Sequence, residues 1–179
     1  MTDQDSEPKT EKPSTLKIQA EILTYDMFMD EILPLGQKCW DECSEIKGET
    51  CSFHGERGFV IQPDVKRYLE LADQDSLLTM TARDDDGVLR GYALCIYYMS
   101  LHHAPVICAN VDTFYVEPEF RACMRRFISK IESEFSDRGV VIVGWATSPA
   151  GKMYDILKLL GYAPDDVIME KRLCALQQQ

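Results

Sequence analysis

A series of three strand-like segments constrains the fold of this chain more than any other feature. The segments are rich in apolar and aromatic residues and lie at residues 76–83, 88–99 and 106–116. Asp84-Asp85-Asp86-Gly87 stands between the first two, and Asp-Gly favours a tight hairpin turn because glycine tolerates a positive φ. Connections this short join antiparallel neighbours, so we expect an antiparallel meander at the centre of the fold.

Helical and strand patterns alternate on both sides of this meander. Asp26 and Asp64 are candidate N-caps of the helices before it, and Pro34 should kink or break the first of them. The other expected elements are a half-buried strand at 17–23, an amphipathic helix at 119–137, a buried parallel strand at 140–143, a helix at 148–160 capped by Ser148, and a last strand at 167–173.

The length of 179 residues suits one domain. Residues 1–15 lack apolar periodicity and carry two prolines, so we predict a disordered tail there and a single domain over residues 16–179. No apolar run approaches the roughly 18 residues that a membrane span needs, and nothing resembles a signal peptide. We therefore expect a cytoplasmic protein that does not bind membranes.

The formal net charge of -11 limits the partners that this chain can have. An acidic chain is repelled by nucleic acid, so we expect none as a partner, and an amine is a suitable cationic acceptor. The seven cysteines should be reduced thiols. The aromatic strand from Tyr92 to Met99 could serve a homodimer interface or only the core.

Three arginines follow the last strand of the meander. Tyr115-Val116-Glu117-Pro118-Glu119-Phe120-Arg121 leads from the strand into the predicted helix, and Arg125 and Arg126 come within the next two turns. A helix N-terminus presents unpaired N–H groups and a positive dipole end, so it binds phosphate readily. These arginines therefore favour an anion site; a solvated face that pairs with the chain's own acids is the alternative.

This junction resembles that of the GNAT family of acyl-CoA-dependent N-acyltransferases, in which an apolar strand end precedes x-Pro-x-aromatic-Arg. Ile156-Leu157-Lys158-Leu159-Leu160-Gly161-Tyr162 resembles the family's late helix, which ends in Leu-Gly-aromatic. The resemblance covers about residues 17–173. It implies an α/β (α+β) domain with a mixed, mostly antiparallel central sheet and helices on both faces. Similar proteins occur in tailed bacteriophages, so a phage-encoded member is one expectation.

The resemblance also implies acetyl-CoA as co-substrate, with its pyrophosphate at the junction and its pantetheine arm between the strands at 106–116 and 140–143. The family pattern is Arg/Gln-x-x-Gly-x-Gly/Ala, but Met124 and Arg126 stand at the two small positions and would crowd a phosphate unless their side chains turn away. The residues expected to bind the cofactor are Phe114, Tyr115, Val116, Arg121, Ala122, Cys123, Met124, Arg125, Arg126 and Ser148.

In the family an amine attacks the thioester directly, which implies roles for further residues. Asp112 stands where many members carry an acid, and it could remove a proton from an ammonium acceptor. Tyr154 could protonate the departing thiolate, because Leu157 occupies the position of the family's tyrosine. Three residues could contact the acceptor: His102, His103 and Glu117. Each residue also has a plainer explanation, as a polar strand residue, a packed aromatic, or an exposed turn or loop residue.

We therefore predict an N-acyltransferase that moves an acetyl or other acyl group from acetyl-CoA to the amine of a small molecule or a protein. The alternative is a catalytically degenerate protein of the same fold, acting as an acidic protein-binding module or inhibitor. No metal is expected. A zinc site is a further alternative for one group of residues, Cys39, Cys43, Cys51 and His54.

Overall fold

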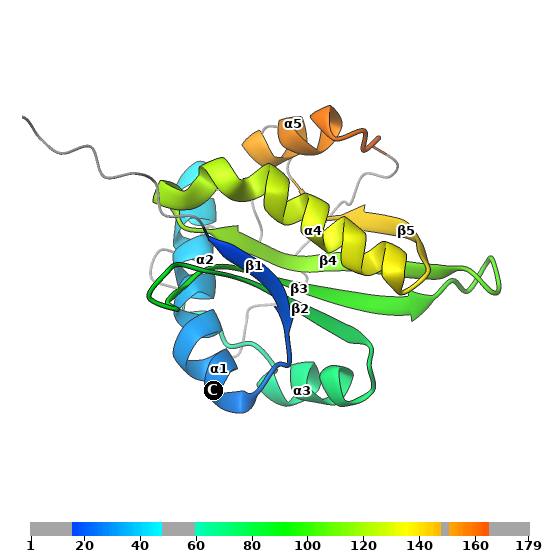
Figure 1. Cartoon of the computed structure of the whole chain (residues 1–179), viewed down its shortest axis with the longest axis horizontal. Coiled ribbons are helices and arrows are strands. Elements are labelled where there is room, and N and C mark those ends of the chain that lie inside the picture. Colours follow the sequence, from blue (N-terminus) through cyan, green and yellow to red (C-terminus); the bar gives the residue numbers. More distant parts are fainter. Residues whose placement is uncertain (1–15, 48–59, 148–150, 165–179) are drawn as a thin grey trace, which may run out of the picture.

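A computed structural model describes residues 16–47, 60–147 and 151–164 of this protein. In these residues a five-stranded sheet has the strand order β1-β2-β3-β4-β5 (Figure 1). The strands are β1 (Lys17–Glu21), β2 (Leu77–Arg83), β3 (Leu89–Met99), β4 (Ile107–Val116) and β5 (Val140–Trp145). Neighbours from β1 to β4 are antiparallel, and β5 is parallel to β4. The expected mixed, mostly antiparallel sheet is confirmed.

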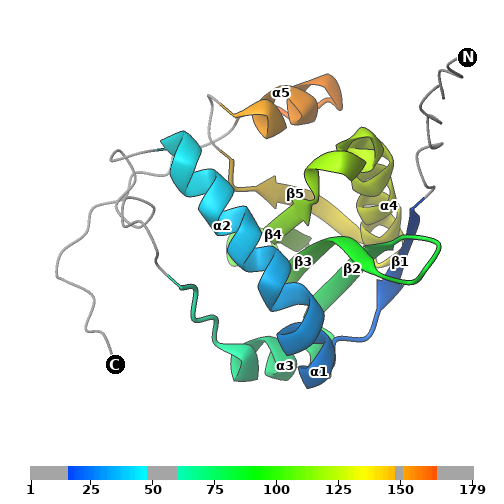
Figure 2. The ribbon, with the colours of Figure 1, turned by 90° about the vertical axis from the view of Figure 1, so that its left-hand side faces the viewer.

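Helices cover both faces of the sheet, with α2 and α4 on opposite sides (Figure 2). The helical segments are α1 (Tyr25–Met27), the π-helical η1 (Phe28–Ile32), α2 (Leu33–Lys47), α3 (Val65–Asp73), the 3₁₀-helical η3 (Pro118–Cys123), α4 (Met124–Asp137) and α5 (Lys152–Leu159). One core cluster joins α1, η1 and α2 to side chains such as Leu94 and Tyr115. The other core cluster joins Phe127, Ile131 and Phe135 of α4 to the opposite face. None of the helices in the described ranges has the length and hydrophobicity of a membrane span.

The start of the first helical segment differs from the prediction in two ways. Thr24, not Asp26, is the N-cap: its hydroxyl oxygen accepts from the Met27 N–H at 3.2 Å. Thr24 comes three residues after the end of β1 and keeps an extended backbone, so the helix begins before Asp26. Pro34 does not break the helix: the helical run continues through it from η1 into α2, and the turn just before it is π-helical, with the Leu33 N–H bonded to the Phe28 carbonyl. The wider turn shifts the hydrogen-bonding pattern at the proline, which has no N–H to donate.

The second half of the chain follows the predicted order with altered details. The Asp84–Gly87 hairpin turn forms, with φ of +82° at Gly87. The helix expected over 119–137 is divided into η3 and α4. The strand at 140–143 is not buried, since Val141 and Ile142 are 69% and 52% exposed. This strand is exposed because it is the last strand of the described sheet. The tail at 1–15, the strand at 167–173 and Ser148 lie outside the described residues, and the N-cap of the last described helix is Gly151 rather than Ser148.

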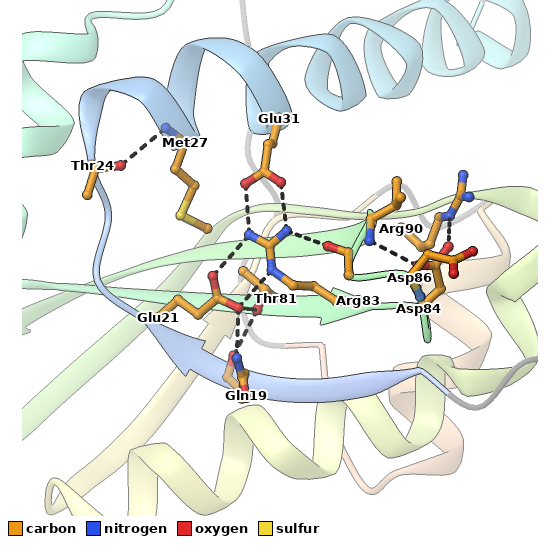
Figure 3. Close-up of polar contacts among 12 residues, drawn as sticks. Gln19, Glu21, Thr24, Met27, Glu31, Thr81, Arg83, Asp84, Asp86 and Arg90 are labelled. Carbon is orange, nitrogen blue, oxygen red and sulfur yellow. Dashed lines mark hydrogen bonds and ion pairs between the residues drawn. The ribbon is translucent and has the colours of Figure 1, made fainter.

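A charged cluster around Arg83 ties the first helical segment to the edge of the sheet (Figure 3). Arg83 Nε and Nη2 donate to the two carboxylate oxygens of Glu21 at 2.9 and 3.0 Å. Its Nη1 and Nη2 donate to those of Glu31 at 2.6 and 2.8 Å, and Nη1 also bonds the Gly87 carbonyl at 3.0 Å. Every N–H of the guanidinium therefore has an acceptor.

Candidate active site

The two parallel strands separate before β4 ends. Their pairing begins at Ile107 with Val140 and stops at Val111 with Trp145, whereas β4 continues beside β3 as far as Val116. The last part of β4 therefore has no strand neighbour on that side among the described residues. The opening lies between the two strands where the resemblance placed the pantetheine arm.

The direction of the backbone along this open edge follows from one hydrogen bond. The Glu117 N–H donates to the Arg90 carbonyl of β3 at 2.9 Å. Because N–H groups alternate in direction along a strand, those of Phe114 and Val116 face the opposite, unpaired edge. The ring of Phe114 lies 5.3 Å from that of Phe127 and 5.5 Å from that of Trp145, so aromatic side chains line one face of the gap. Two of the residues expected to bind the cofactor thus have backbone groups at the open edge.

Asp112 lies at an irregularity in β4 that brings it to α3. Leu94 pairs with Thr113 and Cys95 with Val111, so Asp112 is the extra residue of a β-bulge. Its Oδ2 accepts a hydrogen bond from the Tyr68 hydroxyl at 2.5 Å, and its side chain is exposed. Burial raises the pKa of Tyr68, and the bond to Asp112 raises it further, so the phenol stays a donor. The sequence analysis missed Tyr68 because no pattern in the chain links α3 to this strand.

The turn after β4 differs from the phosphate cradle that was expected. It is a 3₁₀ helix, in which the Phe120 N–H bonds the Glu117 carbonyl and the Met124 N–H bonds the Arg121 carbonyl. In this conformation those amides serve the turn itself, whereas the first N–H groups of an α-helix would be unpaired. Ala122 is exposed in this turn and Cys123 is half-buried.

The two residues at the family's glycine positions do turn away from this turn. The Met124 side chain packs against the core cluster under α4. Arg126 Nη2 donates to the Leu16 carbonyl, next to β1, at 2.6 Å. In this orientation the two side chains do not crowd a phosphate at the turn.

The other two arginines differ in their partners. Arg121 Nε donates to the Val116 carbonyl at 3.1 Å, and its Nη2 forms an ion pair with Glu42 of α2. Glu42 also accepts a hydrogen bond from the Tyr115 hydroxyl at 2.7 Å. Arg125 is exposed and has no acidic partner within the part of the chain that the structure describes. The sequence analysis did not identify Glu42, which comes from a distant helix.

Glu117, a predicted acceptor contact, is not an exposed loop acid. It is only 8% exposed, and its carboxylate oxygens bond Lys38 at 2.5 Å and Arg90 at 3.1 Å. Burial alone would raise the pKa of Glu117, but the hydrogen bonds from Lys38 and Arg90 outweigh it and lower the pKa. This carboxylate is therefore ionised and already paired.

The remaining candidate residues are only partly brought together. Tyr154 is half-buried on α5 with its ring centroid 5.6 Å from Lys158 Nζ, and Leu157 is 4% exposed. His102 and His103 are exposed in the β3–β4 turn, where their amides bond the Ser100 hydroxyl. That turn is at the end of β4 away from the gap, about 20 Å along the strand at about 3.3 Å per residue. Contact of these histidines with an acceptor stays a prediction that the geometry does not support.

The structure describes only half of the candidate zinc set. Cys39 and Cys43 lie on α2, whereas Cys51 and His54 lie outside the described residues. Within the described ranges, no group of three or more His, Cys, Asp or Glu side chains is placed to hold a metal ion.

Comparisons with known proteins bear on the fold. No protein-family model and no curated protein sequence matches the chain. Among solved structures, a variant of the BH1408 protein from Bacillus halodurans has a TM-score of 0.68 at 12% identity, over 88% of this chain and 99% of that one. The aminoglycoside N-acetyltransferase AAC(6')-Iy in complex with CoA has a TM-score of 0.58 at 16% identity, over 88% and 100%. A ribosomal-protein-alanine N-acetyltransferase from Brucella melitensis biovar Abortus 2308 has a TM-score of 0.60 at 14% identity, over 89% and 99%.

These likenesses extend over nearly the whole length of each solved chain, but the sequences have diverged widely. They give no support to a bacteriophage origin. At identities this low they establish the architecture and leave the activity open. The chain has the fold of the GNAT acetyltransferases.

Proposed function

We propose that this protein is an acyl-CoA-dependent N-acyltransferase that transfers an acetyl group from acetyl-CoA to an amine. One observation carries the proposal: β4 separates from β5 after Val111, and among the described residues no strand pairs with Phe114 and Val116 on that side. An open strand edge can bind an extended amide-containing ligand in the same way as it would bind another strand. The pantetheine arm of coenzyme A is such a ligand.

The residues of the turn fit the charged end of the cofactor in part. Arg121 lies on the turn that follows this edge and Arg125 lies in the first turn of α4, and an arginine guanidinium binds phosphate oxygens well. Met124 and Arg126 are directed away, so their side chains leave the turn accessible. The 3₁₀ hydrogen bonds of the turn do not fit a phosphate-binding loop. The Phe120 and Met124 N–H groups would have to leave their carbonyl partners before they could bind phosphate oxygens. Binding is therefore expected to depend on the arginines more than on the backbone of the turn.

The chemistry assigned to the chain begins with the acceptor. Asp112 accepts a proton from the acceptor ammonium, and Tyr68 holds its carboxylate through the 2.5 Å hydrogen bond. The Phe114 and Val116 N–H groups stabilise the oxyanion formed when the amine attacks the thioester. Tyr154 supplies a proton to the departing thiolate, as proposed from its helix position.

The acceptor is proposed to be a small-molecule or protein amine. The net charge of -11 favours a cationic acceptor. The names of two similar structures, an aminoglycoside acetyltransferase and a ribosomal-protein-alanine acetyltransferase, span both kinds of amine. A cytoplasmic location remains part of the same proposal.

Calorimetric titration with acetyl-CoA and coenzyme A tests the proposal without knowledge of the acceptor. Wild-type protein should bind both, and Arg121→Ala should weaken binding about tenfold through loss of a charge-assisted contact. Arg67→Ala on α3 is the matched control, because Arg67 is also exposed and ion-paired but lies on another element. Absence of wild-type binding at millimolar ligand rejects the enzyme and favours the inactive binding module. Equal affinity of Arg121→Ala and wild type rejects only the assigned diphosphate site.

A further inference from the structure

Arg121 is held between the end of β4 and α2. Its Nε bonds the carbonyl of Val116, the last residue of β4, and its Nη2 pairs with Glu42. The guanidinium carbon also lies 6.0 Å from the centre of the Tyr115 ring. The arginine that would contact a diphosphate is thus already bound to a carboxylate of the chain itself.

Glu42 is fixed in place by a second hydrogen bond. Its Oε1 accepts from the Tyr115 hydroxyl at 2.7 Å, while Oε2 faces Arg121. Burial raises the pKa of Tyr115, and the bond to Glu42 raises it further, so the phenol remains a donor to this carboxylate. Two residues that flank the open edge of β4 therefore converge on one carboxylate of α2.

The ion pair is accessible to solutes. The side chains of Arg121 and Glu42 are 43% and 35% exposed. Ion pairs this exposed contribute only about 0.2–1 kcal/mol, because water competes for both partners. A doubly charged diphosphate can therefore displace the carboxylate, but it must do so before it binds the guanidinium.

We propose that Glu42 is a positioning residue that sets the affinity for coenzyme A by competing with the cofactor's diphosphate for Arg121. The inference rests on the proposed function. Carboxylate and phosphate bind the same donors of a guanidinium, so one excludes the other. A carboxylate beside the turn also repels the incoming phosphate oxygens. Glu42 thus lowers affinity both by occupying Arg121 and by its charge.

Calorimetric titration of coenzyme A into Glu42→Gln tests this inference. The glutamine keeps an oxygen for the Tyr115 hydroxyl but loses the charge, so the dissociation constant should fall about fivefold relative to wild type. Glu70→Gln is the matched control, because Glu70 is exposed and ion-paired on α3 and the substitution changes the net charge equally. It should change the affinity less than twofold. If Glu42→Gln does not fold, Glu42→Ala is titrated in its place with the same expectation.

Two further titrations test whether the gain in affinity for coenzyme A depends on Arg121 and on the diphosphate. Glu42→Gln should give no gain in an Arg121→Ala background, and it should not change the affinity for pantetheine, which lacks the diphosphate. Glu42→Gln that binds coenzyme A no tighter than Glu70→Gln overturns the inference while the proposed function stands. A gain that persists without Arg121 overturns it as well. If neither wild type nor Glu42→Gln binds, the proposed function and the inference both fail.

Discussion

Two arginines of this protein each join a helix to the sheet through glutamate, yet their surroundings differ. Arg83 is 18% exposed, and all of its N–H groups bond acceptors from Glu21, Glu31 and Gly87. Arg121 is 43% exposed and bonds Glu42 and the Val116 carbonyl. The first guanidinium has no donor left for another molecule, whereas the second can exchange its carboxylate for one.

The difference separates a structural charge cluster from a site suited to a ligand. A guanidinium whose donors are all satisfied in a partly dry environment is costly to leave unpaired. An exposed pair is weak, since each partner is solvated almost as well when apart. The same residue types can therefore form a satisfied structural cluster around Arg83 and an exposed, exchangeable ion pair at Arg121.

Removal of Arg83 should have the largest effect on stability. Arg83→Met leaves Glu21 and Glu31 facing one another without a cation, and it should lower the free energy of unfolding by about 2–3 kcal/mol, a range reduced for the partial exposure of the cluster. Urea unfolding, monitored by circular dichroism, measures this change in the free energy of unfolding. Arg67→Met on α3 is the control and should have almost no effect, since that side chain is 60% exposed. A loss below about 0.5 kcal/mol would show that the cluster is no more structural than a surface ion pair.

Acidification should weaken the Arg83 cluster with a defined sign. The hydrogen bond from Arg83, the largest cause, lowers the pKa of Glu21 from its ordinary 4.5 to about 2. A lowered folded-state pKa gives stability that is complete above about 4.5 and is lost as the pH falls toward 2. Urea unfolding of wild type and Glu21→Gln between pH 2.5 and 6 should show a stability difference that narrows on acidification. A difference that stays constant over this range would contradict the assignment, because it would mean that the pKa of Glu21 is the same in the folded and unfolded states.

The order of the elements could be predicted because it depends on local patterns. The Asp84–Gly87 turn and the apolar stripe of α4 are readable from a few neighbouring residues. The 3₁₀ turn of Pro118–Cys123 and the π turn before Pro34 could not be predicted, since i+3, i+4 and i+5 hydrogen bonding change the apolar spacing too little over one turn.

The site was predictable only where one element carries it. Asp112, Arg121 and Arg125 lie within one strand-to-helix unit, and the resemblance proposed them as candidates from that unit alone. Tyr68 is 44 residues from Asp112, and Glu42 is 79 residues from Arg121. Their contacts arise when α2 and α3 pack on the sheet, and no spacing in the sequence encodes that event.

Removal of Arg121 should have a much smaller effect on stability than removal of Arg83, which sharpens the comparison between the two arginines. Arg121→Met should lower the free energy of unfolding by less than about 0.5 kcal/mol, because Glu42 is 35% exposed and regains water when it loses its partner. The Tyr115 hydroxyl still donates to Glu42 in this variant, so the contact between α2 and β4 persists. Urea unfolding under the conditions used for Arg83→Met provides the direct comparison. A loss as large as that of Arg83→Met would mean that Arg121 is a structural tie between α2 and β4, and such an arginine would not be free to exchange Glu42 for a diphosphate.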